Sequence, residues 1–324
     1  MEASAVAVSA VIPTRNRPEL LLRAVTSVLQ QTVGNIECIV VIDGSDPATA
    51  RAVHTIRDSR LIVVPLESSV GGSEARNVGA RLARGVWVAL LDDDDEWLPN
   101  RLERQLQRAA GSTSATMVVS RFIDRGGGID LERPTRFPRV GEEISEFLWA
   151  DVSMLGGICG FPQTSTWLVK RDFLLQVPFT KGLRALQDLD WLLHAYRQPG
   201  MHVIFVDEVL TIFNNEQSRD RVAKRIEWQF SYDWAHRNRE LFTSRAFAFF
   251  LIIYCVNPAA QQGAPLRRQL ALLRECYRLG EVTPRLLVLF ALYSGVYPLC
   301  GMLLPKRARS RLLYQFKLLL HGKN

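Results

Sequence analysis

Four consecutive aspartates, Asp92 to Asp95, follow directly after the apolar run GVWVALL. Carboxylates crowded beside a hydrophobic core repel one another and lose hydration, so they need a compensating positive charge. Hard divalent cations such as Mg²⁺ and Mn²⁺ prefer oxygen ligands, and they often take only one or two protein carboxylates beside water and phosphate oxygens. Alternate residues leaving a strand can point to the same side, which favours Asp92 and Asp94 as metal-facing residues.

The end of the acidic run carries a different expectation. For Asp95 and Glu96 we expect a solvated turn, in which a late carboxylate assists the N-terminus of the next helix. A solvated turn is also the alternative for Asp92 and Asp94, and the residues alone leave both interpretations open.

Two further polar groups could contact a ligand. In IDGSD, the carboxylate of Asp43 can accept a hydrogen bond from a base N–H or a ribose hydroxyl, and Gly44 allows close backbone approach. In VGGSEARN, Arg76 and Asn77 would suit an anionic or hydroxyl-rich ligand near a helix start. The alternatives are an ordinary Asp-Gly-Ser turn and a capped helix with a solvated arginine.

The segment QDLDW places Asp188 and Asp190 near the start of a predicted helix. An aspartate at the rim of a cleft can take a proton from an attacking hydroxyl, which accelerates a reaction roughly 100- to 10,000-fold. The alternative is that Asp188 caps the helix. No GxSxG segment supports a Ser-His-Asp system, and the histidines form no HExxH pattern.

The elements that must position these residues alternate between strands and helices. Short apolar, β-branched segments predict strands, and each is followed by a segment with helical spacing. The predicted strands are residues 5–13, 37–42, 60–66 and 85–91. Such alternation indicates a parallel sheet with right-handed crossovers. The segments PTRN, DGSD, ESSVGGSEARN and DDDDE would then meet at its carboxyl edge, where such folds bind ligands.

Two residues mark expected helix starts. Asn16, two residues before Pro18, predicts the N-cap of the first helix, and Ser73 predicts the N-cap of the third. Further strand and helix signals continue to about residue 220, after which the pattern is helical only. We therefore expect a first domain over residues 1–220 and a helical C-terminal region over residues 221–324.

Two stretches of the C-terminal region, residues 246–265 and 286–305, are uncharged. Each is close to the ~20 residues that a membrane helix needs, although internal prolines weaken both as spans. The tail KRARSRLLYQFKLLLHGK alternates basic and apolar residues, as in a helix that lies on an acidic membrane face. The alternative is a bundle of buried helices with a solvated basic tail.

Composition sets the outer limits. A chain of 324 residues with 48% hydrophobic residues can form one large or two smaller domains, and its net charge of +7 favours anionic partners. The five cysteines are scattered without a CxxC pair, which fits a reducing cytoplasm. The first segment lacks the basic and long apolar regions of a signal peptide, so we interpret it as a strand.

With these residues assembled, the chain resembles a family 2 glycosyltransferase of the GT-A fold. The resemblance covers about Val6 to Asn215. It is carried by VSAVIPTRNRPELLLRAVTSVLQQT, IVVIDGSD, GGSEARNVGARLARGVWVALLDDDDEWLP and QDLDWLLHAYR. It implies an α/β, Rossmann-like fold with a mixed, mainly parallel sheet and helices on both faces. In that fold, residues 1–115 would form the nucleotide-sugar half and residues 116–220 the acceptor half.

The resemblance also implies roles for individual residues. Asp94 would bind Mg²⁺ or Mn²⁺, and Asp188 would be the general base of a single inverting displacement at the anomeric carbon. The nucleotide sugar would be bound by Pro13, Thr14, Arg15, Asn16, Asp43, Arg76, Asn77, Asp92 and Asp93. Gln187 stands where the family usually has glutamate, and Arg15 where tyrosine is frequent.

The resemblance implies a nucleotide-sugar donor and a glycan or lipid-linked acceptor, and no nucleic-acid partner. The expected setting is the biosynthesis of cell-surface glycans in the cytoplasm. The basic and apolar character of the C-terminal region fits peripheral contact with the inner face of the plasma membrane. A QxxRW segment is missing from the sequence, which disfavours processive synthesis. The alternatives are a sugar nucleotidyltransferase and a non-catalytic nucleotide-sugar-binding protein.

Overall fold

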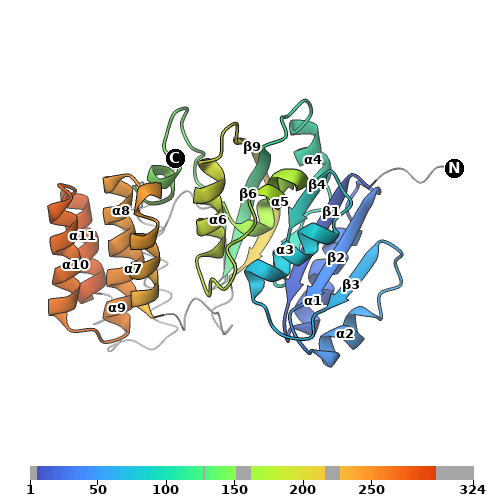
Figure 1. The fold of residues 1–324 in the computed structure, drawn as a ribbon, viewed down its shortest axis with the longest axis horizontal. Coiled ribbons are helices and arrows are strands. Elements are labelled where there is room, and N and C mark those ends of the chain that lie inside the picture. Colours follow the sequence, from blue (N-terminus) through green and yellow to red (C-terminus); the bar gives the residue numbers. More distant parts are fainter. Residues whose placement is uncertain (1–5, 127, 151–161, 216–226, 297–324) are drawn as a thin grey trace. The chain divides into compact units, whose positions relative to one another are not determined.

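The computed structural model describes residues 6–126, 128–150, 162–215 and 227–296 (Figure 1). These residues belong to two compact units. The first unit contains Met1–Pro134 and Pro162–Ser218, and the second contains Thr135–Phe161 and Arg219–Asn324. Residues 135–161, which the sequence analysis places in the acceptor half, therefore group with the C-terminal helices.

The first unit is built on one mixed sheet, which in the described part of the chain has nine strands. They are β1 Val8–Thr14, β2 Ile36–Ile42, β3 Leu61–Pro65, β4 Trp87–Leu90, β5 Glu96–Trp97, β6 Thr116–Gly126, β7 Ile129–Arg133, β8 Leu168–Lys170 and β9 His202–Asn214. The order is β3-β2-β1-β4-β8-β6-β9-β5, with β7 paired to β6. Strands β3, β2, β1 and β4 are parallel, β8 runs antiparallel to β4 and β6, and β9 is parallel to β6. The predicted α/β fold with a mainly parallel sheet is confirmed.

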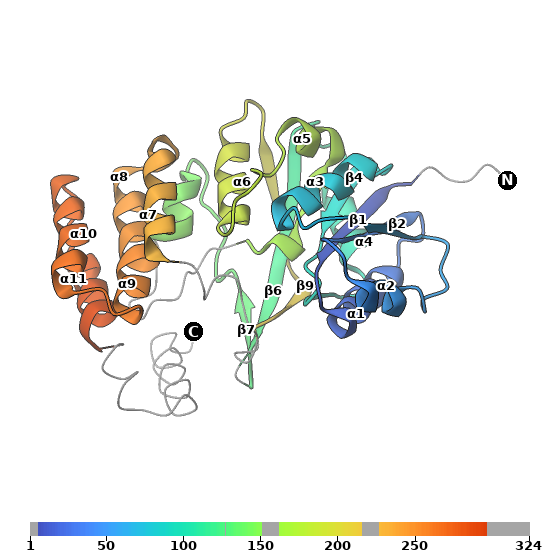
Figure 2. The same cartoon turned by 60° about the horizontal axis from the view of Figure 1, so that its bottom comes forward.

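Helices cover both faces of this sheet (Figure 2). The helices are α1 Pro18–Leu29, α2 Pro47–Val53, α3 Gly72–Leu82, α4 Arg101–Arg108, α5 Arg171–Gln176 and α6 Gln187–Tyr196. Every residue of β2 is buried, as expected for a strand with helices above and below it. One set of alternating strand residues packs with Leu21 and Val25 of α1, whereas Val11 on the other face packs against α3.

A close contact between α3 and β1 fixes the height of that helix over the sheet. A Cβ atom added to Gly79 would lie 2.3 Å from Cγ1 of Val11, so only glycine permits this separation. Arg76 lies one turn earlier in the same helix. The glycine contact therefore determines how near Arg76 comes to the carboxyl edge of the sheet.

Both predicted N-caps are wrong, and the loops explain why. Asn16 has a left-handed φ of 55° and precedes the actual cap position of α1, which is Arg17. Helix α3 is capped by Gly71, whose φ of 85° suits glycine, and Ser73 is buried inside the helix. In each case contacts with a neighbouring loop, which the local sequence does not reveal, determine the backbone.

The second unit is helical. Its described elements are η1 Glu146–Ala150, α7 Trp228–Arg237, η4 Arg239–Leu241, α8 Ser244–Phe250, η5 Leu251–Val256, α9 Asn257–Gln261, α10 Leu266–Arg278, α11 Pro284–Ala291 and η6 Leu292–Val296. Its core is aromatic: Trp149 stacks on Phe242 at 4.8 Å between ring centroids, and Phe250 packs edge-on against Trp149.

The apolar stretch 246–265 forms α8, η5, α9 and the turn to α10 within this unit. Phe247, Phe249, Leu251 and Ile252 are buried in its core, as the alternative of a helical bundle predicts. The stretch 286–305 is described only to residue 296, and the basic tail lies outside the described residues. No helix among the described residues combines the length and apolar character needed to cross a bilayer.

A buried carboxylate in β2 provides a test of this fold. Glu37 accepts hydrogen bonds from Ser9 Oγ at 2.6 Å and from Arg84 N and Nε at 2.7 and 2.8 Å. Burial alone would raise the pKa of Glu37, but the bonds from Ser9 and Arg84 hold that pKa below its usual value.

The stabilisation should be present above the pKa of unfolded glutamate, about 4.3, and should be lost as the pH falls through the lower folded pKa. We expect Glu37→Gln to reduce the free energy of unfolding in urea by about 1–3 kcal/mol at neutral pH, and by less below pH ~4. The control is Glu208→Gln, which removes an exposed pair with Arg104 and should change little. If Glu37→Gln lowered the free energy of unfolding by the same amount at every pH, the ionised form of Glu37 would not be the source of the stabilisation.

Candidate active site

The loops that follow the parallel strands meet at the carboxyl edge of the sheet. Thr14 Oγ1, at the end of β1, donates a hydrogen bond to Asp93 Oδ2 at 2.7 Å, after the end of β4. The backbone N–H of Asn16 donates to Asp46 Oδ2 at 2.6 Å, after the end of β2. The predicted convergence of these polar segments is therefore observed.

Asp43 organises the loop between β3 and α3. Its carboxylate accepts hydrogen bonds from Ser69 Oγ at 2.8 Å, Val70 N at 2.6 Å and Gly71 N at 3.1 Å. Arg15 Nη1 donates to the same Ser69 hydroxyl at 2.9 Å. Asp43, Ser69 and Arg15 are thus joined by hydrogen bonds into one polar surface, and the exposed Arg15 side chain adds positive charge to it.

Asp95 differs from the solvated residue that the sequence analysis expects. It is fully buried, and its carboxylate accepts hydrogen bonds from Ser165 Oγ at 2.6 Å, Gln163 Nε2 at 3.0 Å and Asn214 N at 3.0 Å. Burial raises the pKa of Asp95 well above its usual value, and the nearby negative charges of Asp94 and Asp92 raise it further. Asp95 is thus a structural anchor.

Glu96 also departs from the expected acidic turn before a helix. It begins β5, which pairs with β9, and its carboxylate lies 3.1 Å from Arg23 Nε of α1. Asp95 and Glu96 differ from the expectation for the same reason. Strand β9 and the segment before β8, which are distant in the sequence, cover the end of the acidic run.

Arg17 forms ion pairs with Asp93 and Asp94, and it is a site residue that the sequence motifs do not predict. Its Nη1 lies 3.0 Å from Asp93 Oδ1 and 3.3 Å from Asp94 Oδ2. Burial raises the pKa of Asp93 to about 6, against the opposing effect of Arg17, and Asp94 adds repulsion. The order of the strands could have predicted this contact. Arg17 follows the end of β1, and β1 is the neighbour of β4, the strand that precedes the aspartates.

Arg76 connects the acidic run to the start of α6. Its Nη2 donates to Asp92 Oδ1 at 2.5 Å, and its Nη1 donates to Gln187 Oε1 at 2.9 Å. Only 11% of its side chain is exposed. One guanidinium therefore joins α3, the segment after β4 and α6.

Asp188 lies next to this connection, in the first turn of α6. The preceding N-cap residue, Leu186, has a left-handed φ of 62°, a strained conformation for a branched side chain. Burial raises the pKa of Asp188, whereas the N–H of Leu189 and the charge of Arg76 lower it, and Asp92 raises it again. A carboxylate with a raised pKa among charged partners has the character of a proton acceptor.

Two predicted residues have structural roles. The amide of Asn77 donates to Phe179 O and accepts from Phe179 N, both at 2.9 Å, and the side chain is buried. Asp190 is buried and accepts a hydrogen bond from Thr180 Oγ1 at 2.6 Å. The second N–H of the Asn77 amide donates to Glu74 Oε2 at 3.0 Å, so both of its donors are used within the protein.

The oxygen donors of Asp92 and Asp94 suit a hard divalent cation. The described residues contain no cluster of three or more His, Cys, Asp or Glu side chains arranged to hold a metal. A cation that shares its shell with phosphate and water needs only one or two carboxylates. Asp92 and Asp94 keep 27% and 16% of their side chains exposed, unlike the buried Asp95, so both have access for such an ion.

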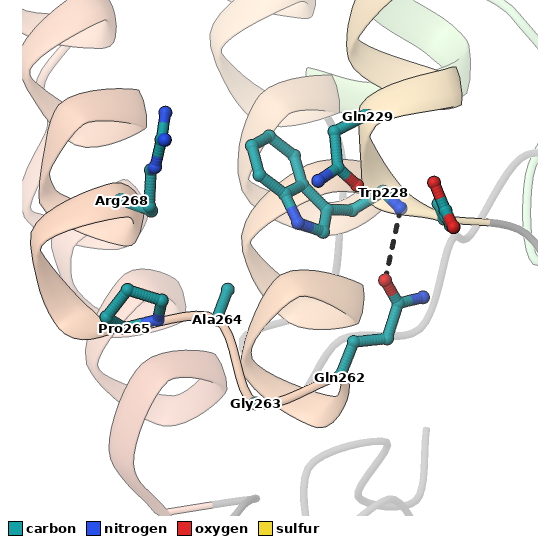
Figure 3. Close-up of a pocket in the computed structure, with 8 residues that line it drawn as sticks. Trp228, Gln229, Gln262, Gly263, Ala264, Pro265 and Arg268 are labelled. Atoms are coloured by element: carbon teal, nitrogen blue, oxygen red, sulfur yellow. Dashed lines mark hydrogen bonds between the residues drawn. The ribbon is translucent and has the colours of Figure 1, made fainter.

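A separate pocket of about 830 Å³ lies in the second unit, between the start of α7 and the turn from α9 to α10 (Figure 3). Gln262 accepts a hydrogen bond from the backbone N–H of Trp228 at 3.3 Å at its edge. Its charged residues are Glu227 and Arg268, and it contains none of the predicted site residues. The carboxyl edge of the sheet therefore remains the candidate site.

The mixed sheet and the acidic run after β4 are the features expected of a glycosyltransferase of the GT-A fold. Residues 9–174, just over half of the 324-residue chain, match the family model described as glycosyl transferase family 2. The chain therefore belongs to glycosyltransferase family 2, and the predicted family and enzyme class are confirmed.

Similar proteins come from several bacteria. The chain is 26% identical over 253 residues to an amylovoran biosynthesis glycosyltransferase of Erwinia amylovora, covering 74% of this chain and 82% of that protein. It is 27% identical over 257 residues to a putative colanic acid biosynthesis glycosyl transferase of Escherichia coli K12, covering 77% and 88%. A shorter match, 36% over 99 residues, covers 31% of this chain and 39% of an Escherichia coli UDP-Glc:α-D-GlcNAc-diphosphoundecaprenol β-1,3-glucosyltransferase.

Two solved structures share the fold. Residues 1–349 of S. aureus TarS match with a TM-score of 0.54 and 16% identity, covering 96% of this chain and 92% of that chain. The mannosyltransferase PcManGT from Pyrobaculum calidifontis, in complex with GDP-Man and Mn²⁺, matches with a TM-score of 0.54 and 19% identity, covering 91% and 87%.

Substitutions at two neighbouring aspartates, Asp94 and Asp95, test whether the buried one stabilises the fold more than the partly exposed one. Asp95→Ala leaves the donors of Ser165, Gln163 and Asn214 unpaired in the interior, so we expect the free energy of unfolding to fall by about 3 kcal/mol or more. Asp94→Ala, at the partly exposed position, should change it by no more than about 1 kcal/mol. Chemical denaturation of both variants tests this, and equal losses would show that the run has no such division.

Proposed function

We propose that this enzyme transfers a sugar from a nucleoside diphosphate sugar to an acceptor hydroxyl, with inversion at the anomeric carbon and assistance from Mg²⁺ or Mn²⁺. The observation that carries the proposal is the double contact of Arg76, which holds Asp92 and the start of α6 together. This contact supports a single site, in which Asp92 would face the donor and Asp188, next to Gln187, would accept a proton.

The proposed donor site follows the carboxyl edge of the sheet. Its residues are Pro13, Thr14, Arg15, Asn16, Asp43, Arg76, Asp92 and Asp93, with Asp94 as the metal ligand. Support comes from the polar surface around Asp43 and from the exposed arginine beside it. We leave out Asn77, because its amide is buried and bonded to Phe179 and Glu74.

The chemistry divides between the two ends of this site. The divalent cation, when bound at Asp94, would stabilise the charge that develops on the leaving diphosphate. Asp188 would accept the proton of the acceptor hydroxyl as that oxygen attacks the anomeric carbon. Arg76 acts through both partners, because it orients Asp92 by a short hydrogen bond and lowers the pKa of Asp188 by its charge.

For the acceptor, we propose a glycan or lipid-linked glycan that is used to build a cell-surface polysaccharide. The names of relatives support this: two refer to amylovoran and colanic acid biosynthesis, and one to a diphosphoundecaprenol-linked acceptor. The setting that fits such an acceptor is the cytoplasmic face of the membrane. Donors named in the related structures are UDP-GlcNAc and GDP-Man, so both nucleotides belong in a donor screen.

Two substitutions test the proposed roles. We expect Asp94→Ala to abolish metal-dependent binding of the donor and, with it, sugar transfer. Asp188→Asn should reduce transfer roughly 100- to 10,000-fold while donor binding stays close to that of the wild type. Calorimetry with UDP- and GDP-sugars in the presence and absence of Mn²⁺, followed by a transfer assay, measures both effects. Release of pyrophosphate from a nucleoside triphosphate and a sugar phosphate would instead identify a nucleotidyltransferase.

The pH dependence of transfer tests the positioning role of Arg76. If Asp188 is the base, the acid limb of the pH–rate profile reports its pKa. Arg76→Gln removes the positive charge that lowers this pKa, so the acid limb should move to higher pH. Arg81→Gln, in the same helix but paired with Glu74, is the matched control and should leave the profile in place. An unmoved acid limb in Arg76→Gln would contradict the role.

A further inference from the structure

Helix α10 of the second unit exposes a row of apolar side chains. Leu266, Leu270 and Tyr277 are 56%, 47% and 73% exposed, and their spacing places them on one side of the helix. The opposite side packs inward through Gln269, Leu272 and Cys276. Single exposed apolar residues are common on protein surfaces, but a row along one helix marks an interaction surface.

Basic side chains lie along the same outer side. Arg267, Arg274 and Arg278 are exposed, and in the described part of the chain none of them forms a salt bridge. Arg268 lies on the same side of the helix as Glu275 and lines the pocket near Trp228, so it is not part of this surface. The acidic residue of the helix is Glu275, which is directed inward, 2.9 Å from His236 Nε2 and 3.2 Å from the Tyr232 hydroxyl. The outer side of α10 therefore combines three arginines with three apolar anchors and carries no carboxylate.

The combination of apolar and basic groups identifies the class of partner. An apolar row alone would suit a groove in another protein, and arginines alone would suit an acidic polymer. A helix that lies in a bilayer interface needs both, because the apolar side chains enter the boundary of the acyl chains while the guanidinium groups remain with lipid phosphates. Tyrosine also favours this boundary, with its ring in the apolar layer and its hydroxyl in water.

We propose that the outer side of α10 docks the protein on the surface of an anionic lipid bilayer. This side is formed by Leu266, Leu270, Tyr277, Arg267, Arg274 and Arg278. The contact is peripheral, and it uses a folded helix of the second unit rather than a membrane span. It does not depend on the proposed transfer reaction, although it would hold the enzyme on the bilayer that carries a lipid-linked acceptor.

The test uses the full-length protein and co-sedimentation with vesicles. Wild type should bind vesicles of phosphatidylcholine mixed with phosphatidylglycerol, and should bind phosphatidylcholine alone much more weakly. The variant Arg274→Gln with Arg278→Gln and the variant Leu270→Ser with Tyr277→Ser should each reduce binding to the mixed vesicles on the order of tenfold or more.

The matched control is Arg51→Gln with Arg108→Gln, which removes the same charge from exposed positions in the first unit and should keep wild-type binding. Thermal unfolding of all variants checks that the fold is kept. A second measurement gives a positive signal for insertion instead of a loss of binding. In the variant Tyr277→Trp, the fluorescence emission of the new tryptophan should move to shorter wavelength when the mixed vesicles are added.

Each remaining outcome overturns the proposal. Wild-type binding by both α10 variants would assign membrane contact to another part of the chain, the tail after residue 296 included. A loss in the arginine variant alone would show that charge attracts the protein to the vesicles and that the apolar row does not enter the bilayer interface. An equal loss in the control would mean that only the net charge of +7 matters.

Discussion

The burial of Asp95 is the constraint on which the candidate site depends. A carboxylate in the interior is tolerated only when its oxygens are satisfied, and here Ser165, Gln163 and Asn214 supply three hydrogen bonds. Those donors come from the segment before β8 and from the end of β9. The bonds therefore fix the path of the chain after β4, and that path determines where the three preceding aspartates point.

Four identical residues in sequence thus occupy four environments. Asp92 meets Arg76, Asp93 is buried between Thr14 and Arg17, Asp94 keeps access to solvent, and Asp95 is sealed inside. The environment, rather than the residue type, sets the affinity of each carboxylate for protons and cations. A cation ligand and its structural support can therefore lie side by side in one short segment.

The sequence predicted correctly those features that depend on a short segment or on the order of the strands. Continuous apolar segments predicted β1 to β4, and the rule that parallel strands end at one edge predicted the meeting of Thr14, Asp43 and Asp93. It failed where a residue's environment comes from elsewhere in the chain. The partners of Asp95 lie about 70 and 119 positions away, and the backbones around Asn16 and Gly71 are set by hydrogen bonds to Asp46 and Asp43.

Gln187 has a consequence for how the charges of this site are shared. An acid at this position, as is usual in the family, would draw on the positive charge of Arg76 and place another anion beside Asp188. The neutral amide accepts the same hydrogen bond without carrying charge, so the guanidinium remains available in full to Asp92. The start of α6 thereby carries one negative charge fewer beside Asp188, a condition that eases the approach of anionic groups to this end of the candidate site.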